Sequence, residues 1–578
     1  MYTKKFILFV LMFGFICQDA LAAGSYKPGE VIVELKNGTV LSSKFLRSSK
    51  TIAASGKSRY MLIKSDESVS QMIKELKGDP DIAKISPNYK REALIIPNDH
   101  YFNDQWGLYN TGQTVNGIHK TTGIPGADID APNGWDITTG SSNVVVADID
   151  SGIDYNHPDL KNNLWKNPGE IPNNRIDDDG NGYIDDVYGI DTVNNDSDPF
   201  DDNGHGTFTA GIIAAEGNND IGISGVCWHC KIMAVKALDS NGIGYDSTII
   251  EAINYIINMK KKYHINIVAI NASLGGYGND EILKDVIKTA GDAGILFIAA
   301  AGNESNDNDI NPLYPASYDL PNIISVAASD SSDTLASFSN YGKTTVDVMA
   351  PGVNVLSTYY DSSGAGYAFA DGTSIAAPFA AGVAALVASK YTAESALEWA
   401  NRIDSGAKPI AANKVLSGRL DLYGALTSDN SPPVISLLSA SDRSGAAPLT
   451  VNFSVSASDL DGAIKEYNWD FDDNGIIDKT TSSPSVSHTY NQAGTYTALV
   501  RVVDNLGARS YKTINITVAK ASSTGSLNQN NTGTSTVGSG SGGGCTIGES
   551  NQIGISLLLF LLISIIYPMM KNRFIGKS

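Results

Sequence analysis

The long central part of the chain, residues 98–428, alternates apolar runs with helical patterns. Five of these runs are apolar at almost every position: VVVADI (144–149), KIMAVKAL (231–238), NIVAINASL (266–274), GILFIAAAG (294–302) and IISVAAS (323–329). A strand that is covered on both faces has this composition, whereas a half-exposed strand alternates apolar and polar residues. The pattern therefore predicts an α/β fold with a central parallel sheet and helices on both faces.

A smaller α/β unit is predicted over residues 24–97. VIVEL (31–35) has the pattern of a strand, SVSQMIKELK (68–77) that of an amphipathic helix, and DIAKISPN (81–88) that of a closing strand. No residue pattern in this unit points to chemistry of its own.

Residues 431–520 have a different texture, with short strands of period two separated by turn residues. The clearest are LTVNFSVSAS (449–458), TYTALVRVVD (495–504) and KTINITVAK (512–520). Several short alternating strands in a segment of this length predict a β-sandwich.

The first 22 residues have the pattern of a secretory signal peptide. Lys4 and Lys5 precede an apolar run over residues 6–16, and ALA at 20–22 supplies small residues for cleavage. The alternative is a buried N-terminal strand. The pattern favours an exported protein.

The other end of the chain predicts a flexible linker over 521–545 and a membrane or sorting tail over 546–578. The linker is rich in Ser, Thr, Gly and Asn. In the tail, the uncharged stretch 553–570 would span about 27 Å as a helix, enough to cross a bilayer core. Basic residues follow it, which places that end in the cytoplasm and the rest outside. A buried helix is the alternative.

Composition narrows the classes of partner. The chain has 62 acidic and 42 basic residues, which gives a formal charge of -20. Such a charge repels nucleic acid and favours solubility and cation binding, so no nucleic-acid partner is expected. With 42% hydrophobic and 18% charged residues, the bulk of the chain is ordinary globular protein.

Three separate stretches hold residue types suited to acyl transfer: DSGID (150–154), NGHGTFTAG (203–211) and GTSIAAP (372–378). A serine hydroxyl is a poor nucleophile at neutral pH and needs a base to take its proton. His205 can serve Ser374 as that base if a carboxylate fixes its tautomer and supports its positive charge, and Asp150 suits this role. Each residue alone has an ordinary alternative, since a serine can cap a helix and an aspartate can end a strand.

Together these motifs resemble the subtilisin-like serine endopeptidases, from residue 98 to residue 428. The chain order Asp, His, Ser is that of subtilisin. Seven motifs fall in the family's order: VVADIDSGID (145–154), NHPDL (156–160), GHGTFTAGIIAA (204–215), GVCWHCKIMAVKAL (225–238), NASLGG (271–276), AAAGN (299–303) and GTSIAAPFAAGVAAL (372–386). The resemblance implies a three-layer fold with a central parallel sheet, and peptide-bond hydrolysis.

The resemblance implies further site residues. Asn303 matches the family's side-chain donor to the oxyanion, beside the Ser374 backbone N–H. The edge segment that pairs with an extended polypeptide substrate matches Ser273, Leu274, Gly275 and Gly276. Leu313 falls at the floor of the primary specificity pocket, where a leucine would favour small or medium uncharged side chains at the scissile position.

Two positions complicate this site. Asp148 stands where the family has an apolar strand residue, and its side chain should point to the same side as that of Asp150. Two close carboxylates would raise one pKa and weaken the support for His205, unless water, a cation or a donor relieves them. Pro378 lacks an N–H, so the helix after Ser374 either begins late or tolerates a missing bond.

An acidic insertion, DDDGNGYIDD (177–186), predicts a structural calcium site. Oxygen-bearing residues occupy EF-hand positions 1, 3, 5 and 9, namely Asp177, Asp179, Asn181 and Asp185. Position 12 is Tyr188 instead of the usual glutamate. A solvated acidic loop is the alternative.

The same spacing recurs at Asp470, Asp472, Asn474 and Asp478, where calcium and a plain acidic turn both remain open. This stretch and the following HTYNQAGTYTALVRVVDNLG (488–507) resemble the PKD domain, an immunoglobulin-like sandwich. Trp469 is expected in its core.

Cysteines are few. Cys17 would leave with the signal peptide, and Cys227 and Cys230 favour a short-loop disulfide in an exported protein, with structural zinc or free thiols as alternatives. Cys545 precedes the apolar tail and resembles bacterial C-terminal sorting signals. Attachment through a lipid or another surface group and an ordinary tail anchor remain open.

Residues 24–97 resemble the family's propeptide, which assists folding and blocks the cleft until it is cut away, here between Lys90 and Gln105. The sequence thus predicts an exported, calcium-assisted serine endopeptidase at the cell surface or membrane. The alternative is an inactive protease-like binding protein that acts through its PKD domain. An esterase of the nucleophile-elbow type would need G-x-S-x-G around Ser374, which is absent.

Overall fold

A computed structural model of the chain describes residues 26–36, 49–55, 58–89, 95–410 and 414–521. The predicted signal peptide, nearly all of the linker, the apolar tail with Cys545, and Lys90 lie outside the described residues.

The central part forms an eight-stranded sheet in which every pair of neighbouring strands is parallel. In spatial order the strands are β16 (Gly418–Arg419), β13 (Val348–Pro351), β12 (Ile323–Ser329), β11 (Leu296–Ala300), β10 (Ile267–Ala272), β7 (Val145–Asp150), β9 (Lys231–Lys236) and β8 (Gly189–Asp191). The five apolar runs became β7, β9, β10, β11 and β12, so the predicted α/β fold is confirmed.

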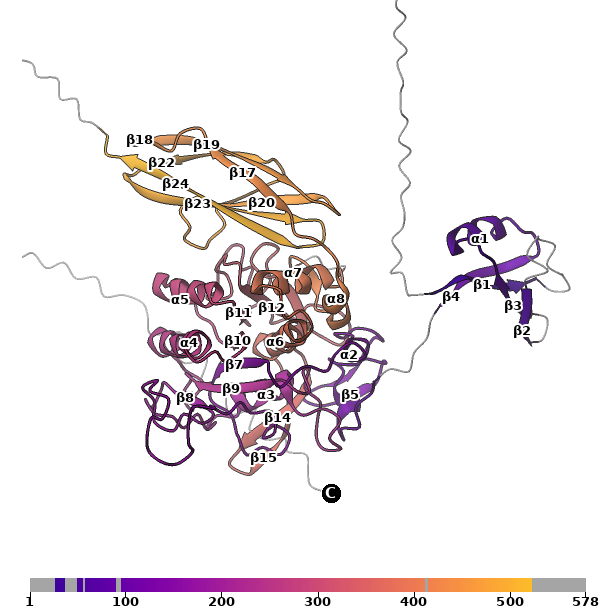
Figure 1. The fold of residues 1–578 in the computed structure, drawn as a ribbon, viewed down its shortest axis with the longest axis horizontal. Helices are drawn as coiled ribbons and strands as arrows, with labels where there is room; N and C mark the ends of the chain where they lie inside the picture. Colours follow the sequence, from indigo (N-terminus) through magenta and orange to yellow (C-terminus); the bar gives the residue numbers. More distant parts are fainter. Residues whose placement is uncertain (1–25, 37–48, 56–57, 90–94, 411–413, 522–578) are drawn as a thin grey trace, which may run out of the picture. The chain divides into compact units, whose positions relative to one another are not determined.

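Helices cover both faces of this sheet (Figure 1). Along β7, Val145, Ala147 and Ile149 pack into the core under α4 (Asp246–Lys261) and α5 (Glu281–Asp292). Val146 packs into the opposite core, under α3 (His205–Ala214) and α6 (Thr373–Lys390). Because side chains alternate along a strand, Asp148 and Asp150 face α3 and α6.

Smaller elements complete the central part. They are η2 (Phe102–Asp104), β5 (Thr114–Asn116), β6 (Lys120–Thr122), α2 (Ala131–Trp135), β14 (Val355–Asp361), β15 (Gly364–Ala370), α7 (Ala396–Gly406) and α8 (Leu422–Thr427). Strands β14 and β15 form an antiparallel hairpin, and β14 packs against α3.

Helix α6 runs through the core. Its 18 residues are long and apolar enough to cross a membrane by length and composition, and 83% of that window is buried inside the fold. The helix continues through Pro378, so it tolerates the missing backbone bond and does not begin late.

The N-terminal unit is an antiparallel sheet with one helix. Its strands lie in the order β2 (Ser49–Ser55), β3 (Ser58–Lys64), β1 (Tyr26–Leu35) and β4 (Ile82–Tyr89), and α1 spans Val69–Leu76. The Ser68 side chain caps α1 by accepting from Gln71 N. Val31, Val33 and Leu35 alternate inward along β1 to meet the buried face of the helix.

The C-terminal unit is a two-sheet sandwich. One sheet contains β17 (Val434–Ala440), β19 (Leu449–Ser458) and β22 (Ser485–Tyr490). The other contains β18 (Ser444–Ala446), β24 (Arg509–Ala519), β23 (Gly494–Asp504), β20 (Ile464–Asp470) and β21 (Lys479–Thr481). Trp469 is 1% exposed in the core between them, as expected.

Two buried arginines of this sandwich pair with aspartates of the sheet domain. Arg501 Nη1 lies 2.5 Å from Asp319 Oδ1. Arg509 bridges two carboxylates, with Nη1 2.7 Å from Asp347 Oδ1 and Nη2 2.5 Å from Asp404 Oδ2. All five side chains are at most 5% exposed. Removing either arginine would therefore leave its aspartate partners buried without a counter-charge.

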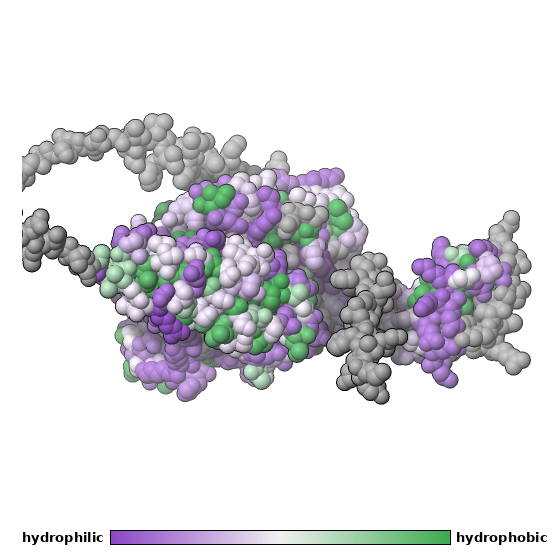
Figure 2. Space-filling model, turned by 90° about the horizontal axis from the view of Figure 1, so that it is seen from above, coloured by the Kyte–Doolittle hydropathy of each residue, from purple (hydrophilic) through white to green (hydrophobic). Residues whose placement is uncertain are grey.

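The surface carries both hydrophobic and hydrophilic residues. On the face seen in Figure 2, hydrophobic residues lie in small patches among hydrophilic ones.

We predict that Arg509→Met destabilises the protein by about 3 kcal/mol or more, because it leaves two buried carboxylates without their cation. The measurement is urea denaturation followed by tryptophan fluorescence. Lys288→Met is the control, since Lys288 is 51% exposed in its ion pair with Asp473 and should change little. Equal stability of the two variants would contradict the prediction.

Candidate active site

Asp150 and His205 meet at the end of β7. Asp150 is the last residue of that strand, and His205 is the first residue of α3. His205 Nδ1 lies 2.7 Å from Asp150 Oδ1, which also accepts from Ser151 N at 2.7 Å. Asp150 is 1% exposed, whereas the His205 side chain is 28% exposed. One imidazole edge is therefore held by a buried carboxylate.

The start of α3 is fixed by Asp201, which precedes the helix. Its Oδ1 accepts from Gly204 N at 2.9 Å, and its Oδ2 accepts from Thr207 N at 2.9 Å. Ser151 Oγ donates to Asp201 Oδ1 and accepts from Gly206 N. Ser151 is thus hydrogen-bonded to one residue before His205 in the chain and to one after it. These bonds set the position of the imidazole.

The pKa of His205 results from opposing effects. Burial lowers it, and the Asp150 carboxylate, followed by Asp148 and Asp201, raises it by more. The net pKa of His205 lies above its ordinary value, so the imidazole readily accepts a proton.

Ser374 lies in the first turn of α6. Because Pro378 has no N–H, the Ser374 carbonyl lacks its usual helical donor, and Ser273 Oγ donates to that carbonyl at 2.8 Å instead. Helices α3 and α6 pack against each other, which brings the segments of His205 and Ser374 together. Within the part of the chain that the structure describes, no direct hydrogen bond joins these two side chains.

Asn303 follows β11 and is bonded to the residue before Ser374. Its Oδ1 accepts from Thr373 N at 2.8 Å and from Thr373 Oγ1 at 3.0 Å. The amide oxygen is therefore used within the protein, and the amide N–H groups are left for another acceptor.

The predicted substrate segment lies beside Leu313. Gly276 and Tyr314 exchange backbone hydrogen bonds, each 2.8 Å long. Leu313 is 4% exposed, and a side chain at Gly275 would overlap its Cδ2 atom. Ser273 is bonded to the Ser374 carbonyl, and Leu274 packs partly buried against the core under α4 and α5.

Asp148 is fully enclosed below this site. Asn271 Nδ2 donates to its Oδ1 at 2.8 Å, and Thr209 Oγ1 lies 2.8 Å from its Oδ2. Burial raises the pKa of Asp148, and the neighbouring Asp150 raises it further, to about 8. The sequence indicated this conflict between the two carboxylates.

The acidic insertion gathers three carboxylates with oxygen atoms within 4.8 Å of one another, those of Glu170, Asp177 and Asp179. Asn181 is bonded to Asp179 and Asp186, and Asp185 accepts from the backbone N–H groups of residues 174 and 175. Two of the predicted ligands, Asp177 and Asp179, therefore lie together with a glutamate that the EF-hand spacing did not indicate, and Asn181 is hydrogen-bonded to both of them.

A second acidic group lies in the C-terminal sandwich. Oxygen atoms of Asp470, Asp472 and Asp478 also lie within 4.8 Å of one another. Asn474 Oδ1 instead accepts from Ile476 N at 2.9 Å.

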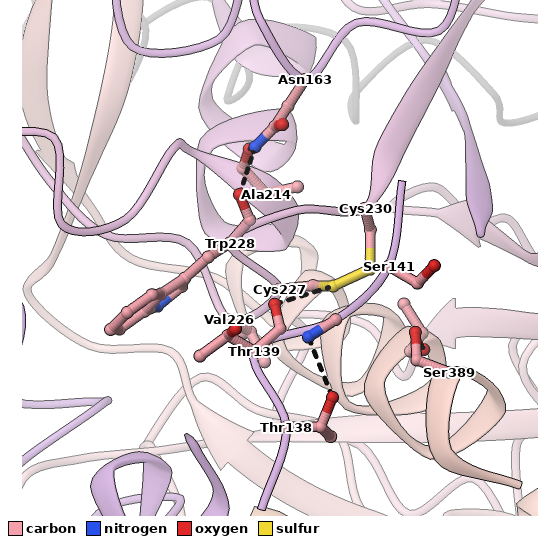
Figure 3. Close-up of a disulfide and its surroundings, with 12 residues drawn as sticks. Thr138, Thr139, Ser141, Asn163, Ala214, Val226, Cys227, Trp228, Cys230 and Ser389 are labelled. Atoms are coloured by element: carbon pink, nitrogen blue, oxygen red, sulfur yellow. Dashed lines mark hydrogen bonds between the residues drawn. A yellow bond between two sulfur atoms is a disulfide. The ribbon is translucent and has the colours of Figure 1, made fainter. Parts of the chain in front are cut away.

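Cys227 and Cys230 form a disulfide, as predicted (Figure 3). It lies beside the segment from Thr138 to Ser141, and a side chain at Gly140 would overlap Cys227 Sγ. Asn163 Nδ2 donates to the carbonyls of Ala214 and Trp228 at 3.0 and 2.7 Å. The disulfide therefore lies within the loop between α3 and β9.

Four residues of this region were not singled out from the sequence: Ser151, Asp201, Thr209 and Asn271. Asn271 had a readable signal, because it is a polar residue inside an otherwise apolar strand. Asp201 also had one, since an aspartate a few residues before a helix is a capping residue.

Comparison with known proteins identifies two family matches in this chain. Residues 141–417 match the subtilase family, and residues 430–518 match the PKD domain. The chain is 36% identical over 414 residues to a thermophilic serine proteinase of Bacillus sp. (strain AK1), over 70% of this chain and 88% of that protein. It is 38% identical over 300 residues to thermitase of Thermoactinomyces vulgaris, over 52% of this chain and 93% of that protein.

A solved structure of proteases from Pseudoalteromonas arctica PAMC 21717 is 28% identical, with a TM-score of 0.45, and covers 57% of this chain and 98% of that one. From the two sequence relatives, each matched over most of its own length, the chain belongs to the subtilase family: it is a subtilisin-like serine peptidase that also carries a PKD domain.

Proposed function

We propose that Ser374 is the nucleophile of peptide-bond hydrolysis, with His205 as its general base and Asp150 as the carboxylate that supports the imidazole. The observation that carries this proposal is the 2.7 Å contact between His205 Nδ1 and the buried Asp150 Oδ1. That contact makes Nδ1 the protonated nitrogen and leaves Nε2 free to take a proton. The His205–Ser374 contact then forms when substrate binds, as is common for catalytic hydrogen bonds.

Asn303 and the Ser374 backbone N–H form the proposed oxyanion hole. The Asn303 oxygen accepts from Thr373, which supports an amide whose N–H groups face the reacting carbonyl. The Ser374 N–H lies in the first turn of α6, where N–H groups have no acceptor within the helix and the helix dipole favours negative charge. Two such donors would stabilise the negative charge as it develops on the carbonyl oxygen.

Polypeptide substrates are proposed to bind as an extended strand along Ser273 to Gly276. Backbone pairing of this kind accepts many sequences, so the pocket at Leu313 would supply selectivity at the scissile residue. The buried leucine against Gly275 supports a short, uncharged pocket.

The sequence patterns at the two ends of the chain are the basis for proposing where the enzyme acts. We propose that the signal peptide directs export and that residues 24–97 act as an intramolecular inhibitor until cleavage. The apolar tail or Cys545 would then hold the enzyme at the membrane or cell surface. A surface binding protein acting through the PKD domain is the weaker candidate, because the complete Asp150–His205 pair favours catalysis.

Calcium is proposed as a structural ligand of the acidic insertion. Glu170, Asp177 and Asp179 supply hard oxygen ligands of the kind that calcium prefers. The ion would offset most of the charge of three close carboxylates and stabilise the loop between β7 and β8. It has no part in the hydrolytic step.

We predict that a fluorophosphonate probe labels the mature enzyme and that Ser374→Ala abolishes the label, because only an activated serine reacts. Asn303→Ala should keep the label but lower kcat by about 10²- to 10³-fold, the range known for the corresponding donor of subtilisin. Gel fluorescence and peptide hydrolysis measure the two effects. Labelling of the Ser374→Ala variant would refute the assignment of the nucleophile.

We predict that a peptide library is cleaved after small or medium uncharged residues. Leu313→Ala enlarges the pocket and should improve cleavage after Phe or Tyr by about tenfold relative to cleavage after Ala. Mass spectrometry of the products measures the preference. A library dominated by Arg or Lys at that position would show the pocket assignment to be wrong.

We predict that a chelator lowers the thermal midpoint and that added calcium restores it. Calcium at about 100 times its Kd should contribute about 2.7 kcal/mol. Asp177→Asn combined with Asp179→Asn should weaken this response. The control variant Asp472→Asn/Asp478→Asn removes carboxylates from the acidic group of the PKD domain and should keep the calcium response of the insertion. A full calcium response in the Asp177/Asp179 variant would exclude the insertion as the site.

A further inference from the structure

Asp148 is a buried carboxyl that forms no hydrogen bond or ion pair with a cation among the described residues. It is 1% exposed, and its hydrogen-bond partners in the described chain are Asn271 and Thr209, both uncharged. An isolated buried carboxylate is costly in free energy, and a group in this position gains stability by keeping its proton.

The hydrogen-bond geometry also favours a proton on Asp148. Thr209 has one hydroxyl proton but two acceptors within reach, Asp148 Oδ2 at 2.8 Å and the Gly206 carbonyl at 3.0 Å. If Asp148 is ionised, this single proton serves only one of them. If Asp148 Oδ2 carries a proton, it donates to Thr209 Oγ1, and Thr209 donates to Gly206. One added proton thus satisfies both contacts.

The opposite oxygen connects Asp148 to the nucleophile segment. Asp148 Oδ1 accepts from Asn271 Nδ2, and the same amide lies 3.1 Å from Ser273 Oγ. Ser273 in turn donates to the Ser374 carbonyl, which Pro378 leaves without a helical donor. On its other side, Thr209 is in the helix that begins with His205.

We propose that Asp148 is a positioning residue that works as a neutral carboxylic acid, donating to Thr209 and accepting from Asn271, and so ties the helix of His205 to the strand segment that holds Ser374. Its proton comes from solvent and is not transferred in the reaction. The proposal rests on the proposed triad.

The charged surroundings of Asp148 make its proton important for catalysis. Asp150 on the same strand and His205 on α3 are its charged neighbours. On β9, Lys236 is engaged by Asp202 and by two carbonyls, and β10 and the first turns of α6 contain no charged residue. Loss of the Asp148 proton would place a second negative charge beside Asp150 and hold His205 in its protonated, inactive form.

The first test is the pH dependence of kcat/KM from about pH 5 to pH 10, corrected by active-site titration. Asn at position 148 reproduces the neutral donor and acceptor pattern without titrating. Asp148→Asn should keep the wild-type ascending limb, because a neutral acid and an amide carry the same charge while His205 titrates, and it should retain activity at alkaline pH, where wild-type Asp148 ionises. The maximal kcat/KM of Asp148→Asn should be close to that of the wild type, whereas Asp148→Ala should lower this maximum by about tenfold.

Asp128→Asn is the matched control for this profile. Asp128 is another buried aspartate whose pKa burial raises, to about 6, and its acceptor bonds go to the backbone of residues 110 and 130, outside the triad. Its profile should keep the wild-type shape. An ascending limb that Asp148→Asn shifts to lower pH would overturn the proposal, because wild-type Asp148 would then already be ionised while His205 titrates.

A second readout does not depend on catalysis. In the Ser374→Ala background, which cannot digest itself, native Asp148 keeps a proton that the unfolded chain releases above about pH 4. Stability therefore falls as pH rises toward 8, and Asp148→Asn escapes this loss. The thermal midpoint of Ser374→Ala/Asp148→Asn should exceed that of Ser374→Ala, and the difference should grow from pH 5 to pH 8.

The two proposals can fail separately. A Ser374→Ala variant that still reacts with the fluorophosphonate overturns the triad. A Ser374→Ala/Asp148→Asn variant less stable at pH 8 than Ser374→Ala alone overturns the neutral acid, because it means that an ionised carboxylate is required at this position.

Discussion

The proposed chemistry depends on one buried hydrogen bond, between Asp150 Oδ1 and His205 Nδ1. The fold makes that contact possible because parallel strands deliver their carboxyl ends to one edge of the sheet, where β7 ends at Asp150 and β11 leads to Asn303. Asp201 and Ser151 then fix the start of α3, so the imidazole meets the carboxylate with little freedom. The order of the strands and the hydrogen bonds at the start of α3 therefore both determine the position of His205.

Polar residues inside the core connect the two halves of this site. Asp148, Asn271 and Ser273 lie on or just after strands whose other residues are apolar, and each bonds to a group near His205 or Ser374. Buried polar groups are costly unless they are satisfied, and here they hold a helix and a strand in register with the reacting groups. Pro378 adds to this arrangement, since its missing N–H leaves the Ser374 carbonyl for Ser273.

Much of this could be predicted from the sequence, because continuous apolar runs and helix signals are local. The strands around Asp150 and the core position of Trp469 follow from such patterns. The carboxylate of Glu170 could not be predicted at the acidic loop, because it lies outside the EF-hand spacing and reaches the loop through tertiary folding. The alternation in β23 likewise gave no sign that Arg501 is buried against Asp319, 182 residues away. Contacts of this kind depend on how surfaces meet, not on local periodicity.

The most direct test of the central claim is the proton NMR signal of His205 Nδ1–H in the inhibited mature enzyme. A short hydrogen bond to a buried carboxylate predicts a strongly downfield imidazole resonance that disappears in Asp150→Ala. An enzyme without this resonance, or an Asp150→Ala variant that keeps it, would contradict the pairing on which the mechanism depends.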